Sequence, residues 1–348
     1  MMATDRIYWI ALVHFRSFGA VRMSRLAAHF PSMERAFNAS ASELIEAGIE
    51  PEIASRFLQE RIHIDPQERA RELEVHGIQA ITVKDDIYPS LLKEIYDPPA
   101  VLFVRGALPD PKRKCIAVVG SRKASRYGKR VIEELVPALA REGLVIVSGL
   151  AHGIDETAHD VTLRCGGTTI AILGSGVDTE SIYPSGNRAL SSRILAAGGV
   201  IMSEFPIGSP PLKQHFPFRN RIIAGMCHGT LIVEAAIKSG SLITARCALE
   251  GGREVYAVPG SIHSLLSEGP NNLIKMGATP VTCADDILGR KPETSSLPLY
   301  EPSNEEETLL WQRLSSSPLH LDELVRGSGL PTPKTLSTLT LMEMKGAV

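Results

Sequence analysis

Six short apolar runs define the hydrophobic pattern of the central part of the chain. They cover residues 116–120, 144–149, 169–174, 200–203, 231–233 and 255–258, and the first three end in glycine. Uninterrupted apolar runs of this length are typical of strands that are buried on both faces. Helical segments lie between them, so the pattern predicts an α/β fold with a doubly wound, Rossmann-like parallel sheet.

The two flanks have a different rhythm. Residues 1 to about 75 have helical periodicity, interrupted by Gly19, Pro31, Gly48 and Pro51, and predict a bundle of short helices. Two further short apolar runs follow within residues 78–104. Residues 289–303 are rich in Pro and Ser and predict a linker. The last residues, 304–348, predict three helices of helix-turn-helix type.

Composition adds a limit on how the protein can bind nucleic acid. The 348 residues are 44% apolar and 22% charged, which fits a globular chain of more than one domain. Lys and Arg number 37 and Asp and Glu 39, a net charge of −2. The chain therefore has no general basic coat, and nucleic-acid binding would need a local patch.

Cysteine usage and the N-terminus predict a cytoplasmic protein. The five cysteines are scattered, without a CxxC pair, which favours reduced thiols over a disulfide scaffold or a zinc ribbon. The N-terminal apolar run is short and has no small-residue cleavage site, so we expect a helix and no signal peptide. No stretch approaches the ~18 apolar residues of a membrane span.

The turn after the first central strand is suited to a phosphate. It begins with Gly120, Ser121, Arg122 and Lys123, and the segment between Asp110 and Glu133 is basic and contains no acid. The spacing matches neither GxxxxGK nor GxGxxG, so the motifs of ATP hydrolysis and of ordinary dinucleotide binding are absent from this turn. Small residues here let backbone amides approach an anion. The alternative is a solvated face around an ordinary turn.

Two later segments point to the same crevice. The first, expected as a loop before the fifth strand, carries Lys213, Arg219 and Arg221, interleaved with Phe216 and Phe218. Arginine binds phosphate bidentately and aromatic rings can stack on unpaired bases, although both rings could equally be core.

The second is a helix start. Ser239, Gly240 and Ser241 precede an apolar helical pattern, so a helix N-terminus would face the anion unless they form a plain cap.

A metal site is the weaker interpretation of another motif. His152, Asp155 and His159 lie at i, i+3 and i+7, which would place them on one helix face. There is no HExxH and no nearby cysteine, so capping by Asp155 and a satisfied His159 are favoured. No GxSxG nucleophile elbow is present either.

Long ordered motifs then resemble the DNA-processing protein A family (DprA, also called Smf) of natural transformation. They are GSR at 120–122, SGLAHGID at 148–155, GSGVDTESIYP at 174–184, SEFP at 203–206, FPFRNRIIAG at 216–225, SGSLITA at 239–245 and GREVYAVPG at 252–260. The resemblance runs from about residue 88 to 288.

The resemblance implies a domain organisation. Residues 1–75 would be a helical SAM-like domain, 76–288 an extended Rossmann-like DNA-binding domain, 289–303 a linker and 304–348 a winged-helix-like domain. The chain stops at Val348, where a winged helix would begin its wing, so we expect three helices without a wing.

The resemblance also implies function. Family members bind single-stranded DNA, dimerise and load the recombinase RecA on the strand, which protects incoming DNA in transformation and recombination. The family's ligand arginine falls on Arg122 and its lysine on Lys213. With the basic segments, the expected DNA-binding set is Gly120, Ser121, Arg122, Lys123, Lys213, Arg219, Asn220, Arg221, Ser239, Gly240 and Ser241. No catalytic residue, cofactor or metal is expected.

One departure concerns the glycine-turn motif. Ser185 stands where many members have a lysine after Tyr-Pro, which puts one phosphate contact in doubt.

An enzyme is the alternative. Residues 225–234 occupy a position analogous to the PGGxGTxxE segment of LOG-type nucleotide phosphoribohydrolases. They lack the double glycine, and Glu234 lies four residues beyond Thr230, not three. Release of ribose phosphate from AMP-type nucleotides would favour this enzyme. A regulator that binds double-stranded DNA would rest on residues 304–348 alone.

Overall fold

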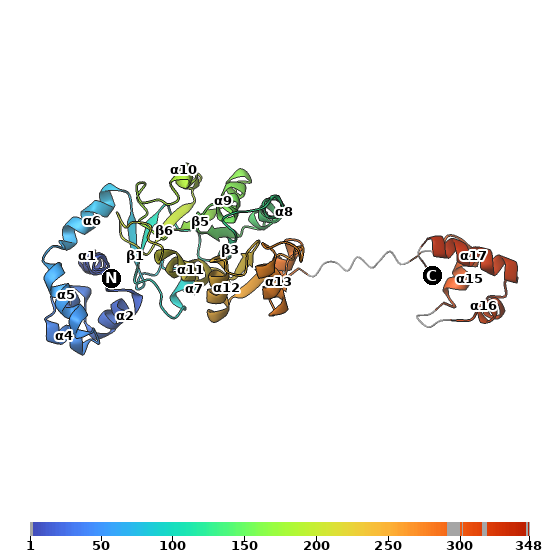
Figure 1. Cartoon of the computed structure of the whole chain (residues 1–348), viewed down its shortest axis with the longest axis horizontal. Helices are drawn as coiled ribbons and strands as arrows, with labels where there is room; N and C mark the ends of the chain where they lie inside the picture. The colour runs from blue at the N-terminus through green and yellow to red at the C-terminus, as the bar shows by residue number, and fades with distance from the viewer. Residues whose placement is uncertain (1–2, 291–299, 301, 315–318, 346, 348) are drawn as a thin grey trace. The chain divides into compact units, whose positions relative to one another are not determined.

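The computed structural model describes residues 3–290, 300, 302–314, 319–345 and 347 (Figure 1). The chain divides into two compact units, Met1–Arg290 and Lys291–Val348, which are treated separately below. Most of the predicted linker, 291–299 and 301, lies outside the described residues. In the part of the chain that is described, no helix is long and apolar enough to cross a membrane.

A nine-stranded sheet forms the centre of the first unit, in the order β1-β2-β6-β5-β4-β3-β7-β8-β9. The six central runs are parallel strands, as predicted. Their bounds are β3 Cys115–Val119, β4 Val145–Ser148, β5 Thr169–Ile172, β6 Val200–Ser203, β7 Gly229–Ile232 and β8 Glu254–Ala257. The sheet continues with β1 (Gln79–Thr82) and β2 (Val101–Arg105), which pair antiparallel, and with β9 (Thr279–Pro280).

Helices cover both faces of the sheet, which explains why its strands are apolar throughout (Figure 1). One face carries α8, α9 and α10, and the other carries α7, α11, α12 and α13. Their bounds are α7 Ser90–Lys93, α8 Arg126–Arg141, α9 Ile154–Arg164, α10 Arg188–Ala196, α11 His215–Gly225, α12 Ser241–Glu250 and α13 Glu268–Lys275. A 3-10 turn (Ser185–Asn187) precedes α10, and α14 (Asp285–Leu288) follows β9.

Six short helices precede the sheet. They are α1 Ala3–His14, α2 Ala20–His29, α3 Met33–Phe37, α4 Ala41–Glu46, α5 Pro51–Arg61 and α6 Pro66–Val75. Ser40 and Glu43 form a capping box at α4, and proline is the first residue of α5 and α6, as helix starts prefer. Their core continues into Val101 and Phe103 of β2, so the helices and the sheet share one hydrophobic cluster.

The second unit contains α15 (Glu305–Trp311), α16 (Leu321–Ser328) and α17 (Thr332–Met344). Its described residues hold these three helices and no strand. The third helix begins three residues before the predicted start at 335, because Pro333 is tolerated in a first helical turn. Buried Glu307 accepts hydrogen bonds from the Ser303 amide and from Lys345, 2.7 Å each, which ties the unit together.

Candidate nucleic-acid interface

The predicted site lies where the order of the parallel strands reverses. The chain leaves β3 toward β4 on one side, and later returns to pair β7 on the other side of β3. A cavity of about 770 Å³ opens at this point, which we call the switch-point cleft. Its walls include Gly120, Ser121, Arg122, Asp155, Tyr183, Lys213, Phe216, Arg219, Asn220, Lys238, Ser239, Gly240 and Ser241.

The turn after β3 is fixed on both sides. The Ser121 amide donates to the Glu234 carbonyl at 2.7 Å, and the Ser121 carbonyl accepts from the Ile154 amide at 3.1 Å. A Cβ on Gly120 would lie 2.7 Å from the Ile154 side chain and 2.9 Å from the Glu234 carbonyl. Glycine is therefore required here, and it holds the backbone amides rigidly at the edge of the cleft.

The Glu234 carboxylate is hydrogen-bonded to the segment that follows this turn. It is buried and accepts hydrogen bonds from the Ser125 amide, at 2.9 Å, and from the Ser125 hydroxyl. A Cβ on Gly128 would lie 2.4 Å from this carboxylate, so α8 needs glycine at this contact. Glu234 therefore fastens the start of α8 to the end of β7 and does not face the cleft as a free acid.

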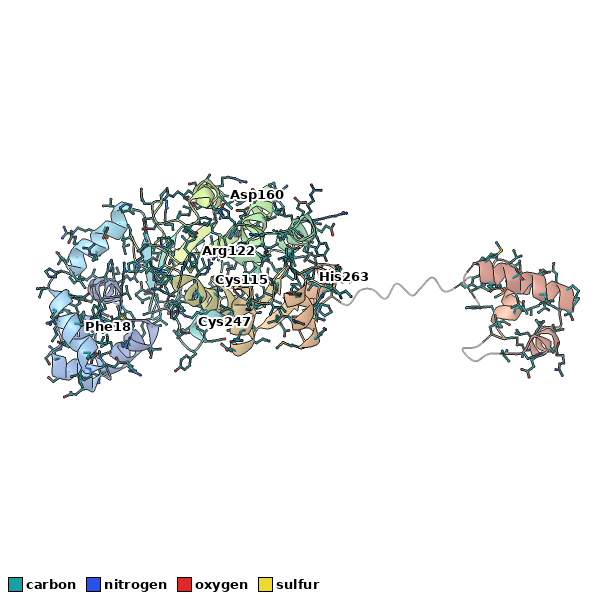
Figure 2. The ribbon with its side chains drawn as sticks, in the orientation of Figure 1. Phe18, Cys115, Arg122, Asp160, Cys247 and His263 are labelled. Carbon is teal, nitrogen blue, oxygen red and sulfur yellow. The ribbon has the colours of Figure 1, made fainter. Side chains whose placement is uncertain are left out.

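Three cations in the cleft are exposed. Arg122, Lys213 and Lys238 form no ion pair with any described residue. The Arg122 guanidinium lies over the Phe216 ring, 5.4 Å from its centroid, and Figure 2 labels Arg122 in the middle of the first unit. The Tyr183 ring lies 5.7 Å from the same Phe216 ring. Cations and accessible rings are thus side by side, as in sites that bind the backbone and bases of single strands.

Arg219 has a different role, because it is only 4% exposed. Its Nη1 donates to the Gly149 carbonyl at 2.6 Å and to the Ile172 carbonyl. A Cβ on Gly149 would overlap the guanidinium, so the glycine makes room for it. Arg219 thus joins the ends of β4 and β5 beneath the cleft. Its positive charge adds to the electrostatic potential of the cleft from below.

Two titratable neighbours lie on the same floor. Burial raises the pKa of Asp155 to about 6, although Arg219 and the Gly149 amide partly offset this. Burial, with a smaller contribution from Arg219, lowers the pKa of His159 to about 3. The His159 Nδ1 lies 2.7 Å from the Thr169 hydroxyl, so this histidine is a neutral core residue.

The metal interpretation gains nothing from this geometry. His152 is exposed and contacts Glu156 at 2.9 Å, whereas Asp155 and His159 are buried with other partners. Among the residues that the structure describes, no cluster of three His, Cys, Asp or Glu side chains could hold a metal ion.

The segment of Ser239, Gly240 and Ser241 forms the opposite wall. The Asn220 amide group donates to the Gly240 carbonyl at 3.1 Å, and the Ser239 and Ser241 hydroxyls are 2.7 Å apart. Helix α12 begins at Ser241, so its positive dipole end lies at the cleft. Its first amides, of Ser241, Leu242 and Ile243, donate to Ser239 and Gly240.

The segment expected as a loop contains helix α11, which decides which arginine reaches the cleft. Pro217 is the third residue of α11 and is compatible with a first turn. Two residues on a helix differ by about 200°, so Arg219 and Arg221 point in opposite directions. Arg221 instead pairs with Glu204 at 2.6 Å and Asp97 at 3.1 Å. Arg221 and exposed Lys123 are not in the cleft wall.

Lys238 is the cleft cation that the sequence analysis missed. It lies between β7 and α12, immediately before Ser239. Its position in a segment already singled out for a helix start was the available signal, because a lysine there would join the same anion site.

Comparisons with known proteins agree with this fold. The family described as DNA recombination-mediator protein A matches residues 79–291, and the DprA winged helix domain matches residues 293–348. The chain is 37% identical to protein Smf of Escherichia coli over 98% of this chain and 93% of that protein. It is 45% identical to DNA processing protein DprA of Streptococcus pneumoniae over 67% of this chain and 80% of that protein.

Two solved structures are similar. One is DNA processing protein A from Streptococcus pneumoniae, with a TM-score of 0.64 and 41% identity, covering 73% of this chain and 88% of that one. The other, from Helicobacter pylori, was described for its single-stranded DNA binding mode. Its TM-score is 0.53 at 29% identity, covering 61% of this chain and 94% of that one.

Proposed function

This chain belongs to the DNA recombination-mediator protein A family, also called DprA or Smf, and from that premise we propose that its switch-point cleft binds single-stranded DNA. The observation that carries the proposal is the convergence of Arg122, Lys213 and Lys238, none with an acidic partner in the described chain, on one cleft. Cations free of ion pairs can release counterions from a DNA backbone without first breaking a bond in the protein.

The cleft has the parts that phosphate binding and base stacking require. The start of α12 offers the positive end of a helix dipole, and the cations add charge-assisted hydrogen bonds. The rings of Phe216 and Tyr183 offer faces on which unpaired bases can stack. Paired bases stack on one another within a duplex, so these rings favour a single strand.

We further propose that the bound strand is protected and then passed to RecA, in transformation and recombination. This step rests on the family and not on a contact surface. It is tested by RecA filament assembly on strands already covered by a single-strand binding protein. No acceleration by this chain would contradict it.

Binding is tested by fluorescence anisotropy with matched single- and double-stranded oligonucleotides over a range of salt. We expect the single strand to bind more tightly. Its log affinity should fall with log salt, with a slope of about −0.7 for each phosphate that the protein neutralises. Tighter binding to the duplex, or an affinity independent of salt, would contradict the proposal.

A non-enzymatic role follows for the same site. Glu234, the acid that a phosphoribohydrolase would need, is buried and bonded to Ser125. We therefore expect no ribose 5-phosphate when the protein is incubated with AMP. Turnover that is lost in Glu234→Gln would support the enzyme instead.

We also propose that the protein is a homodimer, through an apolar patch of Ile237, Ile262 and Leu265. Ile262 is 84% and Leu265 71% exposed, and the loop that carries them includes His263, labelled in Figure 2. The Ala235 amide donates to the Leu266 carbonyl at 2.7 Å, which holds the loop of Ile237 beside it. A two-fold contact buries one such patch against its copy, and so suits a self-complementary apolar surface.

Ile262→Arg should convert the dimer to a monomer. The two guanidinium groups would face and repel each other across the interface, and the apolar burial of Ile262 would be lost. Analytical ultracentrifugation measures the mass. The matched control is Val75→Arg, since Val75 is 83% exposed at the end of α6, outside this patch. A dimer in both variants, or a parent that is already monomeric, would contradict the proposed patch.

A further inference from the structure

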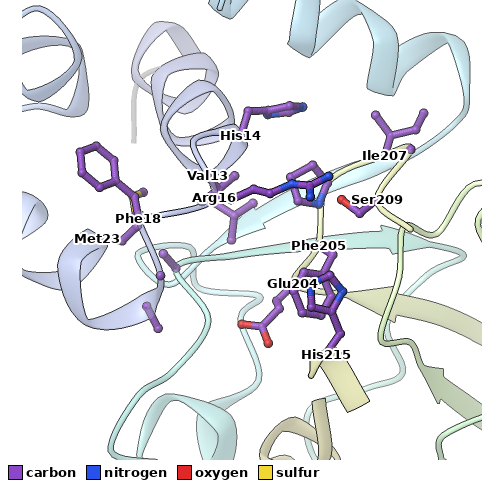
Figure 3. Close-up of a pocket in the computed structure, with 16 residues that line it drawn as sticks. Val13, His14, Arg16, Phe18, Met23, Glu204, Phe205, Ile207, Ser209 and His215 are labelled. Carbon is purple, nitrogen blue, oxygen red and sulfur yellow. The ribbon is translucent and has the colours of Figure 1, made fainter. Parts of the chain in front are cut away.

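A second cavity, of about 240 Å³, lies between the N-terminal helices and the sheet (Figure 3). We call it the N-terminal cavity. One wall comes from the end of α1 and the start of α2, including Arg16 and Gly19. The other wall comes from the loop after β6, including Phe205, and from His215 at the start of α11.

This cavity lies at the same edge of the sheet as the switch-point cleft. The loop after β6 is at the carboxyl end of a strand that is parallel to β5, β4 and β3. Strands β6 and β3 are three positions apart in the sheet, which is about 14 Å. A strand stacked as in B-form DNA, with a rise of about 3.4 Å per nucleotide, covers this distance in about four nucleotides, and a more extended strand in fewer.

Helix α11 separates the two hollows by its first turn. Lys213 and Phe216 line the switch-point cleft, whereas His215, between them in sequence, lines the N-terminal cavity. Tyr183, in the loop between β5 and α10, lies beside Phe216 on the side of the cleft, and His215 lies on the side of the cavity. Aromatic rings are therefore present on both sides of the first turn of α11. A strand leaving the cleft over α11 therefore meets the N-terminal cavity next.

The walls of the cavity suit an unpaired base. The Phe205 and His215 rings are stacked, with centroids 3.9 Å apart and planes at 17° (Figure 3). Burial and, to a smaller extent, the Arg16 charge lower the pKa of His215, although the hydrogen bond to Gly174 partly offsets this. The lowered pKa favours the neutral imidazole as an aromatic face. This ring is held in place through Nδ1, which lies 3.2 Å from the Gly174 carbonyl.

The charge of the cavity favours a phosphate at its mouth. Arg16 is exposed and has no ion pair with the described part of the chain. The acid in the wall, Glu204, is bound to Arg221 at 2.6 Å, although Arg221 also pairs with Asp97, so the charge of Glu204 is offset in part. The cavity is smaller than the roughly 300–1,000 Å³ of sites for drug-sized ligands, which suits a single base.

We propose that the N-terminal cavity binds a base of the same single strand whose phosphates lie in the switch-point cleft, with Phe205 and His215 as the stacking platform and Arg16 at the adjoining phosphate. This rests on the proposed function. It gives the N-terminal helices a direct part in DNA binding, because they supply Arg16 and one wall of the cavity.

Gly19 offers a test that leaves the fold intact. It is the N-cap of α2, with φ −71°, and a Cβ there would meet nothing within 4 Å. Asp and Asn are both good N-cap residues, so Gly19→Asp and Gly19→Asn should fold alike and differ in charge alone. We expect Gly19→Asp to bind the octanucleotide dT8 about fivefold more weakly than Gly19→Asn. Both should bind a dinucleotide, which fills the switch-point cleft alone, as the parent does.

A second measurement reports the stacking itself. An octanucleotide with 2-aminopurine at successive positions should show quenching at one position several nucleotides from the switch-point cleft. Phe205→Leu, which keeps apolar volume without a ring, should remove this quenching and weaken binding about tenfold. Arg16→Ala should weaken dT8 and not the dinucleotide.

The outcomes separate the two proposals. If the parent does not bind dT8, the proposed function itself fails. This inference alone is overturned by a different set of results. The parent binds dT8 and Arg122→Ala weakens that binding, but Gly19→Asp and Gly19→Asn bind dT8 with equal affinity. In addition, Phe205→Leu keeps the quenching. A competition experiment gives a further outcome. If free AMP displaces the quenched base as effectively as unlabelled dT8 does, the cavity takes a free nucleotide and this inference is overturned.

Discussion

Arg122→Ala should weaken the binding of single-stranded DNA about ten- to a hundredfold at moderate salt. Charge-assisted hydrogen bonds contribute roughly 1.5–3 kcal/mol, and the exposed guanidinium has no competing acid in the described chain. The slope of log affinity against log salt should flatten by about 0.7, for one lost phosphate. Arg122→Lys should restore only part, since lysine lacks the planar fork.

Lys123→Ala is the matched control for this prediction. Lys123 is the next residue, carries the same charge and is absent from the cleft wall, so its loss should have a far smaller effect. Combining Arg122→Ala with Lys213→Ala should cost less than the sum of the two changes if both cations hold one phosphate. Arg122→Ala that binds as tightly as the parent would show that the cleft is not the DNA site.

Arg219→Met should reduce the stability of the fold, where Arg122→Ala should not. Arg219 is buried beside Asp155 and donates to the Gly149 and Ile172 carbonyls. Its removal leaves a buried carboxylate without its cation and two carbonyls without a donor, which costs about 3–5 kcal/mol. Urea unfolding at pH 7.5 measures this free energy. An unchanged midpoint would contradict a structural role.

The acidic partner provides the control. Asp155→Asn removes the uncompensated charge, so the double variant with Arg219→Met should be less destabilised than the two changes added together. A strictly additive result would mean that Asp155 and Arg219 do not interact.

The same pair predicts a pH dependence. The folded pKa of Asp155 is about 6, above the usual 3.8, so its protonated form is favoured by folding and stability is lost as the pH rises between these values. Without Arg219 this pKa rises further and the loss extends above pH 6. The folded pKa of His159 is about 3, below its usual 6.5, so the fold loses stability as the pH falls below 6.5. This loss is smaller without Arg219, because the Arg219 charge contributes to the low pKa. Arg219→Met should therefore be closer to the parent at pH 5 than at pH 7.5.

The sequence determined the sheet and the position of the site within it. Strands buried on both faces must be apolar throughout, so the runs near Ile116, Ile146 and Ile170 could be recognised without any structure. The turn at Gly120 and the cations Arg122 and Lys213 follow from the same reasoning, because loops after parallel strands meet at one edge. These features depend on residues close together in sequence.

Tertiary structure decided the rest, because those features depend on direction and on contacts between distant segments. Basic composition alone could not separate Arg219 from Arg221, but the helical turn of α11 sends one to the cleft floor and the other to Glu204. The antiparallel pairing of β2 with β6 brings the N-terminal helices to the sheet edge. Only that packing places Arg16 opposite Phe205, residues 189 positions apart in the chain, since no local pattern encodes a wall formed by two remote segments.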